Sequence, residues 1–167
     1  MQTGISRLEL YRCHIAILPD SIGDLSSLTL LNVSHSLLIH LPDSICALTF
    51  LTELWVNNNQ LSHIPDSIGN LTSLVELYAG VNGLVRLPDS IGNLASLFLL
   101  AVSNNLLISL PDSIGNLACL TLLYVNNNQL THLSDSISNL ISLSQLNADN
   151  NLLTCIPDSI CALTFLA

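Results

Sequence analysis

The sequence predicts an α/β solenoid, in which short parallel strands stack on one side and short helical or 3₁₀ segments on the other. The first observation is that the tetrapeptide Pro-Asp-Ser-Ile recurs in steps of 23 residues without insertion or deletion, with Ser134-Asp-Ser-Ile137 taking its place in one row. The second is that seven columns are apolar in all seven rows when the chain is written in rows of 23 residues from Ile5. One row cannot bury its own apolar face, so the rows are expected to stack on one another.

The first part of each row predicts a strand. In the third row, Leu51-Thr-Glu-Leu54-Trp-Val56 contains the apolar alternation of period two that is typical of a half-buried strand. Asn57-Asn-Asn59 then predicts a turn. Since side chains alternate across a strand, the fourth and sixth columns face the core, and the third, fifth and seventh columns face outward.

The second part of each row predicts a short helical or 3₁₀ segment. Pro65-Asp66-Ser67-Ile68 places proline, aspartate and serine where the first turn of such a segment accepts them. The sixteenth column is aspartate in every row, and we expect these carboxylates to bond backbone N–H groups locally rather than form a cation-binding strip. They are Asp20, Asp43, Asp66, Asp89, Asp112, Asp135 and Asp158.

Residues 51–71, LTELWVNNNQLSHIPDSIGNL, resemble a leucine-rich repeat of the 23-residue type LxxLxLxxNxLxxLPxxIGxL, found in intracellular Ras-group proteins and in bacterial proteins. The resemblance covers residues 5–166. It implies a curved horseshoe with a parallel concave sheet that binds other proteins, and helical or 3₁₀ segments on the convex side. It also implies that the ninth-column asparagines are buried and bond neighbouring rows. Cys13 and Ser36 replace asparagine there, so the first two turns are expected to be held less tightly.

The charge balance excludes several classes of function. The chain has 12 acidic residues against 3 basic ones, for a net charge of −9, and it contains no lysine. A phosphate-binding P-loop and a Schiff-base lysine are therefore excluded, and binding to nucleic acid or to an anionic membrane is disfavoured. No apolar run is long enough to span a bilayer. We expect neither an enzyme nor a bound cofactor.

The cysteines and histidines give no support for a metal site. The five cysteines form no CxxC pair, so free thiols in a reducing, cytoplasmic compartment are the preferred interpretation. His40 and His63 occupy the same column in adjacent rows, and two histidines are able to ligate a metal. The next residue in that column is Arg86, a cation, so solvated surface histidines are the favoured interpretation.

The only tryptophan and all three tyrosines fall in the fifth and seventh columns, on the predicted concave face. One interpretation is that aromatic residues simply favour strands. The other is a binding patch, since tryptophan and tyrosine dominate interface hot spots. In that case a notch above Ala101, between aromatic walls, suits an apolar or cationic side chain of a basic protein or peptide. The candidate site comprises Trp55, Tyr78, Ala101, Tyr124, Glu53, Glu76, Asn57 and Asn126.

A second hypothesis is a structural segment that associates with itself end to end. No polar cap is evident at either end of the repeats, although solenoids need capping for solubility. Residues 42–51 and 157–166 are identical, five rows apart. Residues 1–167 are therefore expected to form one domain of about seven repeats, cut from a longer array.

Overall fold

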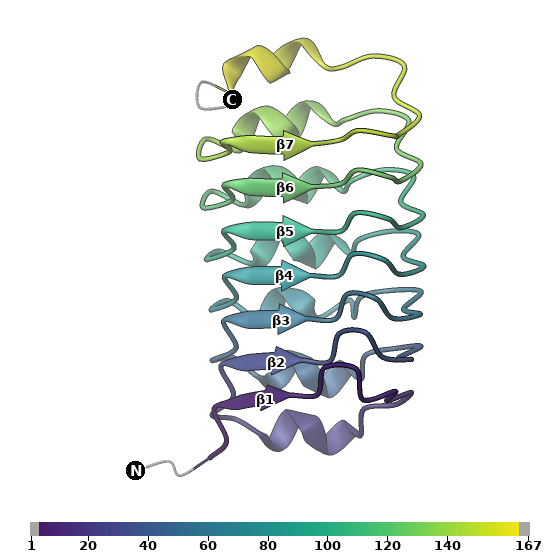
Figure 1. The fold of residues 1–167 in the computed structure, drawn as a ribbon. Helices are drawn as coiled ribbons and strands as arrows, with labels where there is room; N and C mark the ends of the chain where they lie inside the picture. The colour runs from purple at the N-terminus through teal and green to yellow at the C-terminus, as the bar shows by residue number, and fades with distance from the viewer. Residues whose placement is uncertain (1–3, 164–167) are drawn as a thin grey trace.

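The computed structural model describes residues 4–163; the end of the seventh repeat, residues 164–166, lies outside this part. Seven parallel strands form one open sheet in the order of the chain (Figure 1). Their bounds are β1 Arg7–Glu9, β2 Leu30–Asn32, β3 Glu53–Trp55, β4 Glu76–Tyr78, β5 Leu99–Ala101, β6 Leu122–Tyr124 and β7 Gln145–Asn147.

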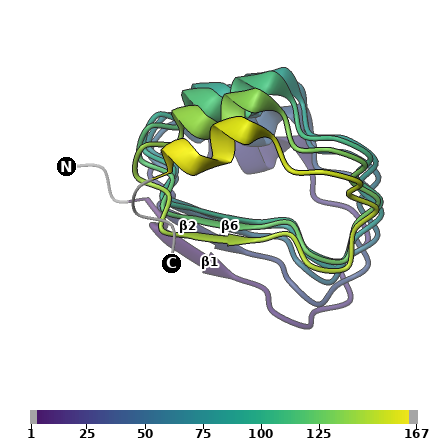
Figure 2. The same cartoon turned by 90° about the horizontal axis from the view of Figure 1, so that it is seen from above.

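The opposite side of the solenoid carries one short 3₁₀ helix per row, labelled η (Figure 2). Their bounds are η1 Asp20–Asp24, η2 Asp43–Ala47, η3 Ile68–Asn70, η4 Asp89–Asn93, η5 Asp112–Asn116, η6 Asp135–Asn139 and η7 Asp158–Ala162. The predicted α/β solenoid with a parallel sheet is thereby confirmed, and its helical segments are 3₁₀. No helix in residues 4–163 is long and apolar enough to cross a membrane.

The register of the sheet follows the sequence repeat. Each strand residue pairs with the residue 23 positions later, so Leu54 lies beside Leu77 and Trp55 beside Tyr78. Figure 2 shows β1 lying farther from the 3₁₀ helices than the later strands do, so the sheet is hollowed on the side away from these helices. We call this outer surface of the sheet the concave face.

The apolar columns form one continuous core between the sheet and the 3₁₀ helices. Leu54, Leu77 and Leu100 are stacked at its centre and are 0% exposed. The prediction fails at both ends, because Ile5 and Ile156 belong to apolar columns but are 53% and 63% exposed. Each lies in a terminal row, with a neighbouring row on one side only.

Several side chains that were predicted to be exposed on the concave face are buried. Leu30 and Leu99 are 4% and 7% exposed, and Asn32 and Ser34 are 7% and 2% exposed. Strand alternation gives the direction of a side chain but not its exposure, which depends on the size of its neighbours in adjacent rows. Asn32, for example, lies directly beside Trp55 in the sheet.

The ninth-column asparagines link successive rows, as the resemblance implies. Asn105 accepts a hydrogen bond from the Leu84 backbone through Oδ1, at 3.0 Å. Its Nδ2 donates to the backbone oxygens of Ala79 and Val102, at 3.1 and 3.0 Å. Ser36, at the same position in the second row, has a buried hydroxyl with no partner among the described residues. The second turn therefore lacks the bonds that hold the later ones.

The 3₁₀ helices stack closely because glycine fills most of the nineteenth column. A Cβ on Gly69 or Gly92 would lie 2.3 Å from the backbone oxygen of the serine in the next row. Cys46 occupies this column in the second row and is buried against the third. The helix that follows, η3, has three residues, whereas its neighbours η2 and η4 have five.

The aspartate column does not bond backbone N–H groups as expected. At η4 the N-cap residue is Pro88, and no side chain caps the helix by accepting a hydrogen bond from its first backbone N–H groups. Asp89 itself lies exposed in the first turn. Among the described residues, a side chain caps a helix only at η6, where Ser134 replaces proline and accepts from the Ser136 amide. An aspartate nevertheless lies in the first turn, near the positive end, of every 3₁₀ helix except η3.

Val81 is held in a backbone conformation that a β-branched residue disfavours. The eighth column is left-handed in every row, with φ near 54° at Val81 and 56° at Asn104. Replacing Val81 by asparagine should therefore raise the free energy of unfolding by about 1 kcal/mol, since the left-handed region penalises Val more than Asn. Urea denaturation of the variant measures this change. The reverse exchange, Asn104→Val, should destabilise by a similar amount, and equal stability of all three proteins would contradict the explanation.

Candidate functional site

Two aromatic rings meet at the centre of the concave face, at the ends of neighbouring strands. Trp55 ends β3 and Tyr78 ends β4, and their ring centroids are 5.2 Å apart with an edge-to-face angle of 67°. The sequence-based expectation that these rings touch is confirmed. Such edge-to-face pairs are attractive beyond the area they bury. Because both residues are part of the hydrogen-bonded sheet, the pair is held in place before any partner arrives.

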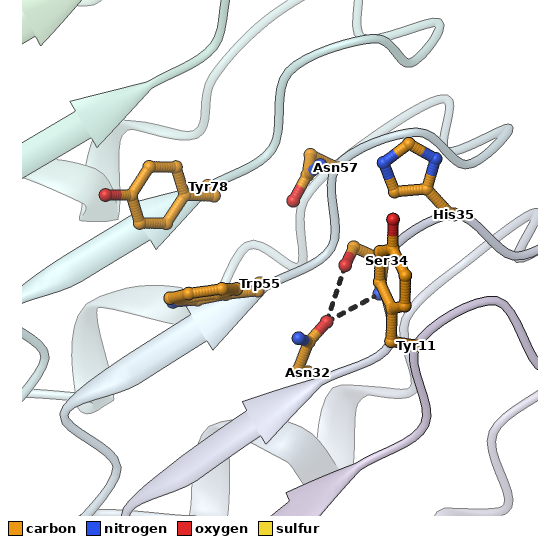
Figure 3. A pocket seen from close by; sticks show the side chains of 7 residues that line it. All are labelled: Tyr11, Asn32, Ser34, His35, Trp55, Asn57 and Tyr78. Atoms are coloured by element: carbon orange, nitrogen blue, oxygen red, sulfur yellow. Dashed lines mark hydrogen bonds between the residues drawn. The ribbon is translucent and has the colours of Figure 1, made fainter.

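The two rings form one side of a cavity of about 310 Å³ (Figure 3). A second aromatic pair lies on its other side, where the Tyr11 and His35 rings are 5.1 Å apart with an angle of 72°. Both residues belong to the turns that follow β1 and β2. The full lining is Tyr11, Asn32, Ser34, His35, Trp55, Asn57 and Tyr78.

Asn32 and Ser34 form the polar part of the cavity, between the two aromatic pairs. The Asn32 Oδ1 accepts hydrogen bonds from the backbone N–H and the hydroxyl of Ser34 (Figure 3). The side chain of Asn57 has no hydrogen bond to other described residues and projects toward the cavity (Figure 3). The cavity thus combines aromatic rings with amide and hydroxyl groups, and it contains no carboxylate.

Two carboxylates lie beside the aromatic pair, at the starts of the same strands. Glu53 and Glu76 are neighbours in the register of the sheet, and both are half-buried. The ion pairs within residues 4–163 join Arg7 to Glu9 and Arg86 to Asp66, so neither glutamate has a cationic partner there. Burial raises the pKa of Tyr78 above its ordinary value, and the charge of Glu76 raises it further.

The remaining predicted site residues lie further along the sheet. Ala101 ends β5 and Tyr124 ends β6. The Tyr124 hydroxyl donates to Gln145 Oε1 at 2.8 Å, so this ring is engaged with the following row. Asn126 accepts a hydrogen bond from the Ser103 hydroxyl. Of the predicted set, the structure brings Trp55, Tyr78 and Asn57 together in the cavity, with Glu53 and Glu76 beside them.

The cavity also includes residues that the sequence did not indicate as a site. Tyr11, Asn32 and Ser34 lie in the fifth and seventh columns but were not assigned to it, and His35 was not considered at all. One available signal was the pairing of small polar residues in the second row with large aromatic residues in the first and third. His35 also occupies a left-handed position that is asparagine in four other rows, at φ 54°.

A second hollow lies on the side of the solenoid near the aspartate column. It is lined by Asp43, His63, Pro65, Asp66, Ser67 and Arg86. Arg86 Nη2 is 3.1 Å from Asp66 Oδ1, and both side chains are largely exposed. Such an exposed ion pair contributes little to stability. Within residues 4–163, no three potential metal ligands lie together, and His40 and His63 are exposed.

The chain was compared with protein families and with curated proteins. A family model described as a leucine-rich repeat region matches residues 6–82. None of the curated proteins matches the sequence significantly.

Solved structures of leucine-rich repeat proteins resemble the chain over nearly its whole length. A leucine-rich repeat protein of Leptospira interrogans is 29% identical, with a TM-score of 0.74, over 97% of this chain and 53% of its own. YopM, an effector protein of Yersinia pestis, is 31% identical, with a TM-score of 0.79, over 96% of this chain and 47% of its own.

A third resemblance is to a plant receptor. The ectodomain of the receptor kinase GASSHO1/SCHENGEN3 of Arabidopsis thaliana, in complex with CASPARIAN STRIP INTEGRITY FACTOR 2, is 30% identical, with a TM-score of 0.81. The match covers 90% of this chain and 19% of the receptor. The chain thus spans about half or less of these proteins. The repeat pattern, the stacked strands and 3₁₀ helices, and these matches agree that the chain contains a leucine-rich repeat region and folds as a leucine-rich repeat solenoid.

Proposed function

We propose that the chain is a non-enzymatic protein-interaction module that binds a partner protein or peptide on its concave face. The observation that carries the proposal is the aromatic pair Trp55–Tyr78, which is fixed on a rigid sheet beside a cavity. Tryptophan and tyrosine in such positions dominate the energy of protein interfaces, and a preformed site avoids the entropy cost of ordering. The resemblance to a receptor ectodomain solved in complex with another molecule supports the same function.

We also propose that the partner is basic around its contact residues. Glu53 and Glu76 have no cationic partner among the described residues, although they are adjacent in the sheet. Like charges directly opposite each other in a sheet are destabilising, and a cation from the partner would relieve this repulsion. The net charge of −9 would also speed encounter with a basic surface.

Replacing Trp55 or Tyr78 by alanine should weaken partner binding by about 2 kcal/mol or more, because each change removes half of the aromatic pair. The partner is first captured from cell extract by the wild-type chain and identified by mass spectrometry. It is then purified and titrated into the wild-type and variant chains in a calorimeter.

The matched control for these variants is His63→Ala, which removes an exposed ring away from the concave face. This variant should bind the partner as the wild type does. If both concave variants keep full affinity while His63→Ala loses it, the binding site lies on the other side of the solenoid.

The alternative function, end-to-end self-association, has its own structural support. Ile5 and Ile156, in the first and last rows, belong to apolar columns but are 53% and 63% exposed, and within residues 4–163 β1 and β7 each pair with only one strand. Apolar side chains and free strand edges of this kind favour stacking between copies. Light scattering over a range of concentrations distinguishes the two functions, since steady growth in mass favours stacking and a constant mass contradicts it.

We further propose that the protein works in a reducing, cytoplasmic compartment. Its five cysteines are free, and they are dispersed along the solenoid without a disulfide. Burial raises the pKa of the Cys46 thiol above its ordinary value, so this thiol stays neutral and unreactive. Cell fractionation with detection of the protein tests the location, and recovery in a secreted fraction would contradict it.

A further inference from the structure

Asn32 presents a hydrogen-bond donor of fixed orientation to the cavity. The residue is only 7% exposed, and its Oδ1 accepts from both the N–H and the hydroxyl of Ser34. An N–H group donates only to the amide oxygen, so these bonds determine which side-chain atom is oxygen and which is nitrogen. Figure 3 shows the amide nitrogen on the opposite side, facing Trp55. It has no hydrogen bond to any residue in the described part of the chain.

The walls on either side of Asn32 are aromatic. The Trp55–Tyr78 pair lies on one side and the Tyr11–His35 pair on the other. Neighbouring strands of a sheet are about 4.8 Å apart, so the first and third rows are about 10 Å apart. The space above Asn32 and Ser34, the small side chains of the second row, is therefore wide enough for one further ring. The guanidinium of Arg12 already lies 5.1 Å from the centroid of the Tyr11 ring, so a second cation is disfavoured at that wall.

We propose that this cavity binds one uncharged aromatic side chain of the partner, and that Asn32 Nδ2 donates a hydrogen bond to a backbone carbonyl oxygen of the same residue. The inference rests on the proposed function and identifies the chemistry of the contact. Basic residues of the partner then lie beside the cavity, at Glu53 and Glu76, rather than inside it. The central contact between the chain and its partner then lies between Trp55 and the first row of the solenoid, rather than above Ala101 at the end of β5.

The probe for this inference is N-acetyl-L-phenylalaninamide, which carries an uncharged ring and two carbonyl groups. A ligand of this small size should bind with a dissociation constant of about 1 mM. Trp55 is the only tryptophan of the chain, so its fluorescence reports the occupation of the cavity directly. Nuclear magnetic resonance should also show a shift of the Asn32 side-chain amide protons in the wild-type chain, a readout that requires no variant.

The variant that isolates the donor is Asn32→Asp, which keeps the acceptor for Ser34 and replaces the free N–H₂ by oxygen. It should bind the probe about tenfold more weakly, since a donor becomes an unpaired acceptor facing a carbonyl. The matched control is Asn147→Asp. Asn147 occupies the same column in the seventh row and makes the same local bond, accepting from the Asp149 backbone at 3.0 Å, but it lies outside the cavity. This control should bind the probe as the wild type does.

The comparison probe is N-acetyl-L-lysinamide, which replaces the ring by a cation and should bind at least fivefold more weakly. Tighter binding of the lysine probe, or no binding of the phenylalanine probe at 20 mM, would overturn the inference. So would equal affinity of the wild type and Asn32→Asp combined with an unshifted Asn32 amide signal. These outcomes would not contradict the proposed function, which is tested separately. That test is the titration of the partner into the Trp55→Ala variant, and it does not involve the probes.

Discussion

Replacing Leu77 by alanine should lower the free energy of unfolding by about 2–5 kcal/mol. Leu77 is the central residue of β4 and is 0% exposed, between Leu54 and Leu100 in the neighbouring strands. The change removes buried apolar atoms and leaves a cavity, because the rows on both sides hold the backbone in place. Urea denaturation followed by circular dichroism measures the loss.

The control for this variant is Ile141→Ala, which removes a similar volume from a side chain that is 69% exposed. Its stability should stay within about 0.5 kcal/mol of the wild type. A loss below about 0.5 kcal/mol in Leu77→Ala as well would show that the fourth column is not the packed centre of the core.

Replacing Asn105 by alanine should cost about 3 kcal/mol or more, since several buried backbone groups lose their partner at once. The Asn105 side chain accepts from the amide of Leu84 and donates to the oxygens of Ala79, Val102 and Ser103. It is 6% exposed, so water cannot easily replace these bonds. The variant should denature at a lower urea concentration and exchange the Leu84 amide proton faster.

The neighbouring Asn104 provides the control for this prediction. Its side chain is exposed and makes no hydrogen bond within the described residues, and its φ of 56° suits glycine. Asn104→Gly should therefore change stability by well under the loss expected for Asn105→Ala. If the two variants lose stability equally, the turn depends on local backbone conformation rather than on the asparagine bonds between rows.

The arrangement of the rows could be predicted because each repeat has the same length. A constant step of 23 residues places Trp55 beside Tyr78 and Leu54 beside Leu77, whatever the details of the turns. The buried asparagines followed from the resemblance, and Ser36, which replaces asparagine in the second turn, has a buried hydroxyl without a partner among the described residues. The aspartates were misjudged: at η4, for example, Pro88 occupies the N-cap position, and Asp89 lies exposed in the first turn without capping the helix.

The repeat in the sequence by itself determined the solenoid, the register of its sheet and the meeting of the two central aromatic rings. These features depend only on period and on the alternation of side chains along a strand. The cavity was decided by the tertiary structure alone. Its second wall, Tyr11 and His35, comes from turns in two rows, and its donor is oriented by the bond between Asn32 and Ser34. Side-chain rotamers and contacts between rows create that space, and neither leaves a periodic signal in a sequence.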